Sequence, residues 1–539
     1  MFHLDSAVQR PDRNLDRHGC RKRDQFVGQR CLLDRTHRYS AGAIGDIRRN
    51  YPLLRERCDH HCADADRVLG RKLRIRFDVR GHSRCDCNRN GVDALRSSGK
   101  VPCLESGGRV SLDNSLRDLS ECVDAELARD AVRRNEFNAW TTIVEGAAIA
   151  VDPPAASPLR GVPFGVKDVI DVAGVPTAAG SKFPATNAAK DAPVVASLKR
   201  AGAVVVGKNA THEFAYGPTG EIAAAGPTLN PTDKKRISGG SSSGSGAAVA
   251  AGDVAFSLGT DTGGSVRIPA ALCGVVGFRP TQDRLSVEGV LPVSPTLDTV
   301  GVIAASTDVL RAVWFGLAET ETAYVALSQL SVGVVTGEPV DACSAEISNA
   351  FLASVASMEN LGAATNHVDL DSMNAALTVY RAIHGPEASA FHRARLDESP
   401  ELFQATTLGR LSDGAHVPGW QYVEALETRR RWISNIEGLF GRHDVLICPT
   451  TPLVAPELGT GATPFGPWAS RSQALLSLTV PWSLLGVPSA SVPMGRDGDG
   501  MPMGLQIIGR PDADELVIGV AAALQEQLFE ISTGLPNQG

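Results

Sequence analysis

The sequence lacks three features that would place it in common classes of protein. It has no run of about 18 apolar residues, so no membrane span is expected. Its amino end turns Arg-rich without the apolar stretch of a signal peptide, which makes the cytoplasm the default location. It also lacks excess positive charge, because the net charge is −7 and the pI about 6.0, so we expect no nucleic-acid partner held by bulk charge.

What remains is typical of a globular protein. Apolar residues make up 43% of the 539 residues and charged residues 21%, which is ample for a sizeable core. The length allows either several domains or one large α/β domain.

Residues 1–105 differ sharply from the rest. They hold 20 Arg but 3 Lys, 12 Asp but 2 Glu, and 7 of the 11 Cys, so that their net charge is +9 and the remaining 434 residues carry −16. No helical or strand periodicity runs through them. This composition is also typical of an unselected reading frame in a GC-rich gene.

Three interpretations of this segment stay open. A metal module is one, but C-x3-C and C-x-C do not match structural zinc spacings. A basic arm for acidic partners is another. We favour a disordered extension or misassigned start over residues 1–108, with the folded domain at 109–539. The metal module would use Cys58, His60, His61, Cys62, His82, Cys85 and Cys87.

From residue 110 onward, apolar periodicity predicts strands that alternate with helices, which is the pattern of a layered α/β fold. Residues 305–440 are expected to be mostly helical with loops. Helices are expected at 111–134, 192–201 and 247–251, through residue 272 and from residue 514, and strands at 138–144, 162–166, 203–206, 254–258, 444–448, 489–493 and 504–508.

One lysine stands at the end of a predicted strand. Lys167 follows the apolar run 162–166 and precedes Asp168. An ammonium in such a stretch must be desolvated or paired. A surface pair with Asp168 is the ordinary explanation, and a catalytic amine is the alternative.

Two glycine turns, Gly240-Ser241 and Gly264-Ser265, each place a hydroxyl in a short stretch of small residues. Glycine lets a ligand approach the main chain closely. Ser265 is expected at the amino end of a helix, where free N–H groups stabilise a developing oxyanion.

Two familiar motifs fail on inspection. The segment from Gly202 to Asn209 nearly fits a phosphate-binding loop, but its centre is made of β-branched strand formers. The segment Gly240–Gly244 fits the nucleophile elbow of α/β hydrolases, with Ser242 as nucleophile, but no strand precedes it.

The block from residue 158 to 281 closely resembles the amidase signature family of serine hydrolases. It contains Gly-Val-Lys-Asp at 165–168, Gly-Gly-Ser-Ser at 239–242 and Asp-Thr-Gly-Gly-Ser at 261–265, and the resemblance covers nearly all of 111–539. It implies a single large α/β/α domain around a mixed, twisted sheet.

The resemblance also implies a Ser-cisSer-Lys triad. Its general base falls on Lys167, its proton relay on Ser241 after a cis peptide bond, and its nucleophile on Ser265. The backbone N–H groups of Thr262, Gly263 and Gly264, with that of Ser265, would hold the oxyanion. Neither a metal nor a cofactor is implied.

Side chains around these positions receive more modest interpretations. Asp261 and Arg267 are expected to form a structural ion pair, and His212 to be a structural hydrogen-bonding residue. Ser242, Ser243 and Ser245 are expected to bond to backbone, and Cys273, Cys343 and Cys448 to be buried thiols. Pocket-lining positions are assigned to Phe214, Tyr216, Tyr380, His384, Glu387 and His392.

Three functions remain open at this point. The first is a free-standing amidase that cleaves a small carboxamide or urea-type amide, with a homodimer left open. The second is the A subunit of a glutamine-dependent aminoacyl-tRNA amidotransferase, although Ser483-Leu-Leu-Gly stands where such subunits usually have Asn-Leu-Ala-Gly. The third is a catalytically silent scaffold, against which the intact triad residues argue.

Overall fold

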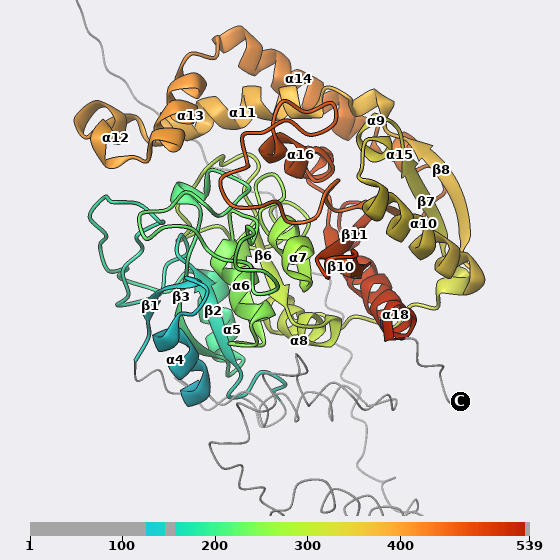
Figure 1. Ribbon diagram of the computed structural model, residues 1–539, viewed down its shortest axis with the longest axis horizontal. Coiled ribbons are helices and arrows are strands. Elements are labelled where there is room, and N and C mark those ends of the chain that lie inside the picture. The colour runs from blue at the N-terminus through green and yellow to red at the C-terminus, as the bar shows by residue number, and fades with distance from the viewer. Residues whose placement is uncertain (1–124, 146–156, 534–539) are drawn as a thin grey trace, which may run out of the picture. The chain divides into compact units, whose positions relative to one another are not determined.

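One mixed sheet organises the part of the chain that the computed structural model describes, residues 125–145 and 157–533, with side chains to residue 525. The sheet has 11 strands, and the pairs β2–β3, β2–β4, β7–β8 and β7–β9 are parallel. In sheet order the strands are β1 (Trp140–Ile143), β3 (Val204–Asn209), β2 (Pro163–Lys167), β4 (Phe256–Thr260), β6 (Val300–Ala304), β5 (Val276–Arg279), β10 (Ser489–Arg496), β11 (Pro502–Gly509), β9 (Val445–Pro449), β7 (Ser331–Thr336) and β8 (Ala364–Asp369) (Figure 1).

Both faces of this sheet are covered, as β9 shows. Its residues alternate between two apolar clusters: Val445 and Ile447 join one cluster, and Leu446 and Cys448 join another. Successive side chains of a strand point to opposite faces, so both faces of β9 are buried. Strands covered on both sides read as continuous apolar runs, which is why 444–448 could be predicted from the sequence.

Helices form a layer on each face of the sheet. The first layer is α5 (Pro193–Arg200), α8 (Thr307–Ala318), α10 (Ala345–Asn360) and α18 (Asp514–Thr533). The opposite layer includes α6 (Ser243–Ala250), α7 (Arg267–Cys273), α15 (Ile436–Phe440) and α17 (Val480–Leu485). At the first edge of the sheet, α4 (Ala125–Arg134) packs on β1 and β3.

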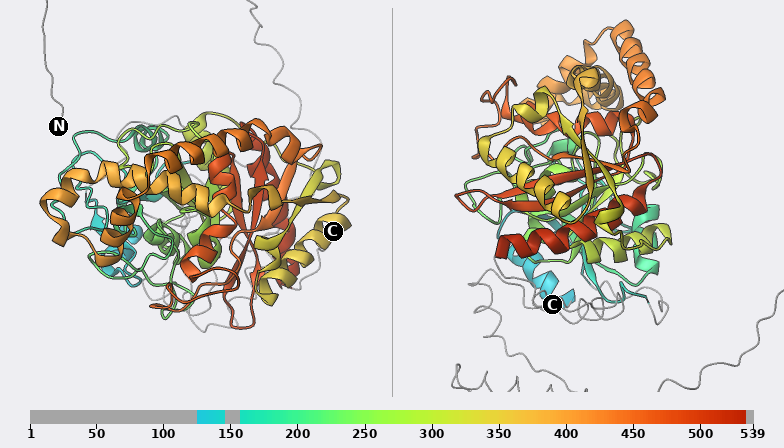
Figure 2. Two further views of the ribbon diagram at one scale, coloured as in Figure 1. Left: turned by 90° about the horizontal axis from the view of Figure 1, so that it is seen from above. Right: turned by 90° about the vertical axis from the view of Figure 1, so that its right-hand side faces the viewer.

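A third group of helices lies beyond the second layer, as the right-hand view of Figure 2 shows. Of these, α11 packs against α13, α14, α16 and α17. The group consists of α11 (Ala376–Phe391), α12 (Arg393–Glu398), α13 (Ala405–Ala415), α14 (Gly419–Ser434) and α16 (Arg471–Ser477), and the short α9 (Glu338–Asp341) follows β7.

The mixed α/β/α fold expected from the resemblance is confirmed, but the expectation for 305–440 was wrong for two strands. β7 and β8 pair in parallel there, joined by α10. β8 is an edge strand of sequence Ala-Thr-Asn-His-Val-Asp, and its side chains are mostly exposed. An edge strand has no continuous buried face, so apolar periodicity gives no signal for it. Of the helix predicted at 111–134, the part 125–134 is present as α4, whereas residues 111–124 and the segment 1–108 lie outside the described residues.

Trp314 joins the first helical layer to the sheet, and its removal is expected to be costly. The buried indole packs edge-on against Phe278 of β5 at a centroid distance of 5.3 Å, and its Nε1 donates to Glu515 of α18 at 3.0 Å. Trp314→Ala is expected to lower the free energy of unfolding in urea by about 3–5 kcal/mol, because a buried aromatic leaves a cavity.

The neighbouring Phe315 provides the control, since it lies on the same helix but is 40% exposed. Phe315→Ala is expected to cost less than about 1 kcal/mol. Equal losses for the two variants would contradict this account of how α8 is held.

Candidate active site

Two side chains of the candidate site lie at the ends of neighbouring parallel strands. β2 ends at Lys167 and β4 ends at Thr260, and the pairing of Val166 with Leu258 sets the two strand ends side by side. The carboxyl ends of parallel strands meet at one edge of a sheet, so these two side chains project into the same region. Open α/β sheets place their ligands at this edge.

Lys167 is held there by two hydroxyl groups. Its Nζ lies 2.8 Å from Ser241 Oγ and 2.7 Å from Thr260 Oγ1, and the residue is fully buried. Burial lowers the pKa of Lys167 to about 7, against the opposing effect of the Asp261 and Asp298 carboxylates. A large fraction of the amine is therefore neutral at physiological pH, as a general base requires.

The surface pair of Lys167 with Asp168 is excluded by this geometry. Asp168 is also fully buried, and it pairs with Lys208 of β3, with Nζ and Oδ1 3.1 Å apart. Lys208 belongs to the near-match to a phosphate-binding loop, and the structure places it inside a strand, so rejection of that motif is confirmed.

Ser241 follows a cis peptide bond from Gly240. Its carbonyl accepts from the His212 N–H at 3.1 Å and from Thr211 Oγ1 at 3.0 Å, which anchors the residue on the 211–212 segment. The next N–H, that of Ser242, donates to the Ser265 carbonyl at 3.2 Å, so the two serine-bearing turns lie in contact. Within the described ranges, no hydrogen bond joins Ser241 Oγ to Ser265 Oγ.

The serines in and just after the nucleophile-elbow motif donate hydrogen bonds to backbone carbonyls, as expected. Ser242 Oγ donates to the Thr260 carbonyl at 3.2 Å, and Ser245 Oγ donates to the Leu258 carbonyl at 3.1 Å. Ser243 Oγ donates to the Ala210 carbonyl at 3.4 Å. All three are fully buried, so the elbow interpretation with Ser242 as nucleophile finds no support.

Ser265 lies in a turn that the Asp261 carboxylate organises. Oδ1 accepts from the Gly264 N–H at 2.8 Å and Oδ2 from the Val266 N–H at 3.2 Å, so the two oxygens hold amides on both sides of Ser265. Ser265 itself keeps 7% of its surface exposed, just before α7. The hydroxyl is therefore presented at a helix amino end, as the sequence predicts.

The oxyanion donors need one revision in detail. The Gly264 N–H donates to Asp261, so in this geometry it is not directed at a ligand. The N–H groups of Thr262, Gly263 and Ser265 have no acceptor among the described residues. Gly264 contributes its conformation instead, because its φ is 135° and a Cβ there would lie 2.3 Å from Thr479 Oγ1.

Asp261 is the centre of a buried charge network. Arg267 donates to it from Nε at 3.0 Å and from Nη2 at 2.8 Å, and Arg279 Nη1 lies 3.3 Å from Oδ1. Burial by itself would raise the pKa of the Asp261 carboxyl, but the two arginines outweigh it and hold that pKa far below its usual range. The structural ion pair expected between Asp261 and Arg267 is present.

The pocket-lining residues predicted from the sequence fall into separate groups. Tyr380 is nearest the turn at residues 261–265, since a Cβ on Gly263 would lie 2.6 Å from its Oη. His384 stacks on Tyr380 at a centroid distance of 4.1 Å and lies 5.2 Å from the Tyr216 ring. The other three predicted residues, Phe214, Glu387 and His392, contact other parts of the structure.

Those three residues make structural contacts. Glu387 accepts from Ser294 Oγ at 2.6 Å and from Thr296 Oγ1 at 2.9 Å. Phe214 and His392 pack on each other at a centroid distance of 4.3 Å, within a larger aromatic group.

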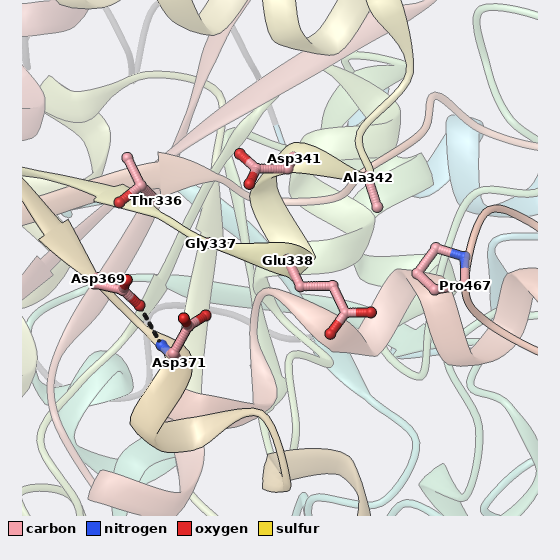
Figure 3. A pocket seen from close by; sticks show the side chains of 8 residues that line it. All are labelled: Thr336, Gly337, Glu338, Asp341, Ala342, Asp369, Asp371 and Pro467. Atoms are coloured by element: carbon pink, nitrogen blue, oxygen red, sulfur yellow. Dashed lines mark hydrogen bonds between the residues drawn. The ribbon is translucent and has the colours of Figure 1, made fainter.

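Two features of the described residues bear on other ligands. No three His, Cys, Asp or Glu side chains in them gather as a metal site would require, and no helix in the same ranges is long and apolar enough to cross a membrane. A separate hollow lies beside the ends of β7 and β8, and Figure 3 shows that carboxylates line it. None of the triad residues lines this hollow.

Comparison with known proteins decides what this arrangement is. The family model described as Amidase matches residues 123–518. The chain belongs to the amidase family. Since the family and the solved neighbours are amide-hydrolysing enzymes, this protein is an amidase.

Individual relatives add detail. The chain is 35% identical over 462 residues to a 1-carboxybiuret hydrolase subunit of Pseudomonas sp. (strain ADP), covering 81% of this chain and 96% of that protein. It is 35% identical over 410 residues to the A subunit of glutamyl-tRNA(Gln) amidotransferase from Methanospirillum hungatei, covering 68% and 93%. A Kluyveromyces lactis allophanate hydrolase structure matches with a TM-score of 0.66 at 26% identity, over 79% of this amidase and 71% of that chain.

Some groups of the site were missed from sequence. Thr260, which contacts Lys167, carries no spacing signal beyond its place in the motif, and the sequence assigned Asp261 its ion pair with Arg267 but not its hydrogen bonds to the turn. The expectation for His212 also fails: its ring is fully buried, and neither ring nitrogen has a partner among the described residues.

The Asp261 network generates a stability prediction. Arg267→Met is expected to lower the free energy of unfolding by about 3–5 kcal/mol, because it leaves a buried carboxylate short of a partner. The Asp261 carboxylate, which accepts from the Gly264 and Val266 N–H groups, would be held less firmly without Arg267, so amide exchange of these two N–H groups should also accelerate.

Arg284 offers a matched control, since its ion pair with Glu515 has side chains 39% and 27% exposed. Arg284→Met is expected to cost less than about 1 kcal/mol. If both variants lowered the free energy of unfolding equally, the buried network around Asp261 would stabilise the fold no more than an exposed ion pair does.

Proposed function

We propose that this amidase cleaves the C–N bond of a small carboxamide or urea-type amide through an acyl-enzyme on Ser265. Lys167 is the general base and Ser241 the proton relay. The observation that carries the proposal is the buried amine of Lys167, which contacts Ser241 Oγ at 2.8 Å and has its pKa lowered by burial to about 7. A neutral amine can accept a proton that an ammonium cannot.

The proton moves in two steps as the bond forms. Ser265 Oγ attacks the amide carbonyl carbon and gives its proton to Ser241 Oγ, which gives its own to Lys167 Nζ. The proton returns along the same path to the leaving ammonia or amine, and the C–N bond breaks. Water then hydrolyses the ester and releases the carboxylic acid. Ser241 Oγ and Ser265 Oγ are not hydrogen-bonded in the described ranges, and catalytic hydrogen bonds often tighten only when substrate binds.

The negative charge on the carbonyl oxygen is met by backbone donors. The N–H groups of Thr262, Gly263 and Ser265 precede the amino end of α7 in the chain and are free of acceptors in the described residues. Thr262 is held by its Oγ1, which donates to Asp298 at 2.6 Å. Donors fixed in advance need no reorganisation when the charge appears.

Relatives supply the substrate chemistry to be tested. Their names include 1-carboxybiuret hydrolase, allophanate hydrolase and glutamyl-tRNA(Gln) amidotransferase. Ammonia release from biuret-type compounds, allophanate, simple amides and glutamine therefore forms the first panel. Glutaminase activity that appears only with a partner protein would favour the amidotransferase instead. A silent scaffold has no support, because the family is enzymatic.

The first test removes the nucleophile and the base one at a time. Ser265→Ala and Lys167→Ala are each expected to lower kcat at least about a thousandfold, because groups that act as a unit fail together. Lys167→Ala with Ser265→Ala should therefore be no worse than either alone. Ser242→Ala is the matched control, since that hydroxyl bonds only to backbone. Wild-type turnover by Ser265→Ala would overturn the assignment.

The second test is the pH profile. The pKa of Lys167 is lowered to about 7, so the neutral amine is lost as pH falls below that value. We expect kcat/KM to fall about tenfold per pH unit below this pKa and to level off above it. A rate that is flat from about pH 5 to about pH 9 would show that no such base limits the reaction.

A further inference from the structure

Thr479 contacts the turn at residues 261–265 from the second helical layer. It stands just before α17, is fully buried, and donates from Oγ1 to the Gly263 carbonyl at 2.6 Å. The Leu476 carbonyl lies further from the same oxygen, at 3.3 Å. A hydroxyl has one proton to donate, so the shorter contact takes it. The hydroxyl of Thr479 is therefore committed to the backbone of this turn.

The peptide group between Gly263 and Gly264 is held at both ends. Its carbonyl accepts from Thr479, and its N–H donates to Asp261 Oδ1 at 2.8 Å. The C=O and N–H of a trans peptide point in opposite directions, so the two partners hold it from opposite sides. Arg267 joins these partners, because it donates to the Asp261 carboxylate and, from Nη1, to the Thr479 carbonyl at 3.0 Å. Two glycines in sequence would otherwise leave this peptide group free to rotate.

The peptide groups that carry the Thr262 and Ser265 N–H groups have partners of their own. The carbonyl of the first accepts from Arg279 Nη1, and the carbonyl of the second accepts from the Ile268 N–H at 2.8 Å. Because each carbonyl is bonded, the N–H at the other end of its peptide group keeps its direction. These two of the three proposed oxyanion donors are therefore fixed without Thr479.

The Gly263 N–H is different. Its peptide group begins at the Thr262 carbonyl, which accepts no hydrogen bond in the ranges that the structure describes. Its direction therefore depends on the groups that flank it in the chain. On one side the Thr262 hydroxyl donates to Asp298 at 2.6 Å, and on the other side Thr479 holds the Gly263 carbonyl.

We infer that Thr479 is a positioning residue for amide hydrolysis at Ser265, and that it acts by fixing the Gly263 N–H as an oxyanion donor. The inference rests on the proposed function. Oxyanion donors are most effective when their direction is set before the charge develops, and loss of one donor costs roughly 10²–10³ in kcat. A donor that is loosened rather than lost should cost part of that factor.

The alternative is a purely structural role. In that role Thr479 joins α16 to α17 through the Leu476 carbonyl and fills space with its methyl group. The two roles depend on different atoms. Packing depends on the methyl group, whereas positioning depends on the hydroxyl and acts on the transition state alone.

The test separates the hydroxyl from the methyl group in the full chain, on the panel amide that the native protein hydrolyses fastest. Thr479→Val loses only the hydroxyl and should lower kcat about tenfold to a hundredfold, with KM within about threefold of native. Thr479→Ser keeps the hydroxyl and should stay within about threefold in both constants. The midpoint of the pH profile should not move in either variant, because Lys167 is bonded to Ser241 and Thr260 and not to Thr479.

Thr451→Val is the matched control. Thr451 is also fully buried, and its Oγ1 donates to the Leu453 carbonyl at 3.0 Å, outside the turn at 261–265. Its kcat should stay within about threefold of native. Thr479→Ala brings no methyl group against the Gly263 carbonyl, so it gives the same reading if Thr479→Val does not fold. Native kcat in these hydroxyl-free variants, or an equal loss in Thr479→Ser, would overturn the inference.

Amide exchange separates this inference from the proposed function. In a Ser265→Ala background, where the proposed nucleophile is absent, adding Thr479→Val should speed deuterium uptake in a peptide that covers residues 261–266. Adding Thr451→Val should not. Unchanged uptake, or faster uptake in a Thr479→Val protein that keeps native kcat, overturns the role of Thr479. Amide hydrolysis that survives in Ser265→Ala would count against the proposed function instead.

Discussion

The carboxylate of Asp261 is the constraint on which the catalytic region depends. It is fully buried, its charge is balanced by Arg267 and Arg279, and it accepts N–H groups on both sides of Ser265. The arginines carry the network outward, because Arg267 also donates to Gln506 of β11 at 2.7 Å and to the Thr479 carbonyl at 3.0 Å. The turn is thereby tied to both the centre of the sheet and the second helical layer, and its three free amides keep their direction.

Burial has opposite consequences for two neighbouring residues at the end of β2. Lys167 meets only hydroxyl oxygens, so desolvation dominates and its pKa falls to about 7. Asp168, next in the chain, points the other way and pairs with Lys208 at 3.1 Å. Adjacent side chains at a strand end face opposite sides of the sheet, so Lys167 meets the hydroxyls of the candidate site while Asp168 forms a buried ion pair with Lys208.

Much of the fold and the position of the site could be predicted from the sequence. Continuous apolar runs identified β2, β3, β4, β9, β10 and β11, and the serine-bearing turns identified the region of Ser241 and Ser265. The polar edge strand β8 gave no periodicity, and β5 and β6 were not singled out between their turns. The partner of Asp168 and the contact of Thr260 with Lys167 depend on residues tens of positions apart, which local pattern does not encode.

The sequence by itself determined the candidate catalytic groups and their order: an amine at 167, hydroxyls at 241 and 265, and small residues that let the backbone turn. Their types and spacing carry the family resemblance, and the proposed reaction needs each of these types. Only the tertiary structure decided which groups are desolvated and which amides are already bonded. The reason is physical: solvent exclusion and long-range pairing set the protonation state and direction of a side chain, and both arise only when distant strands and helices pack together.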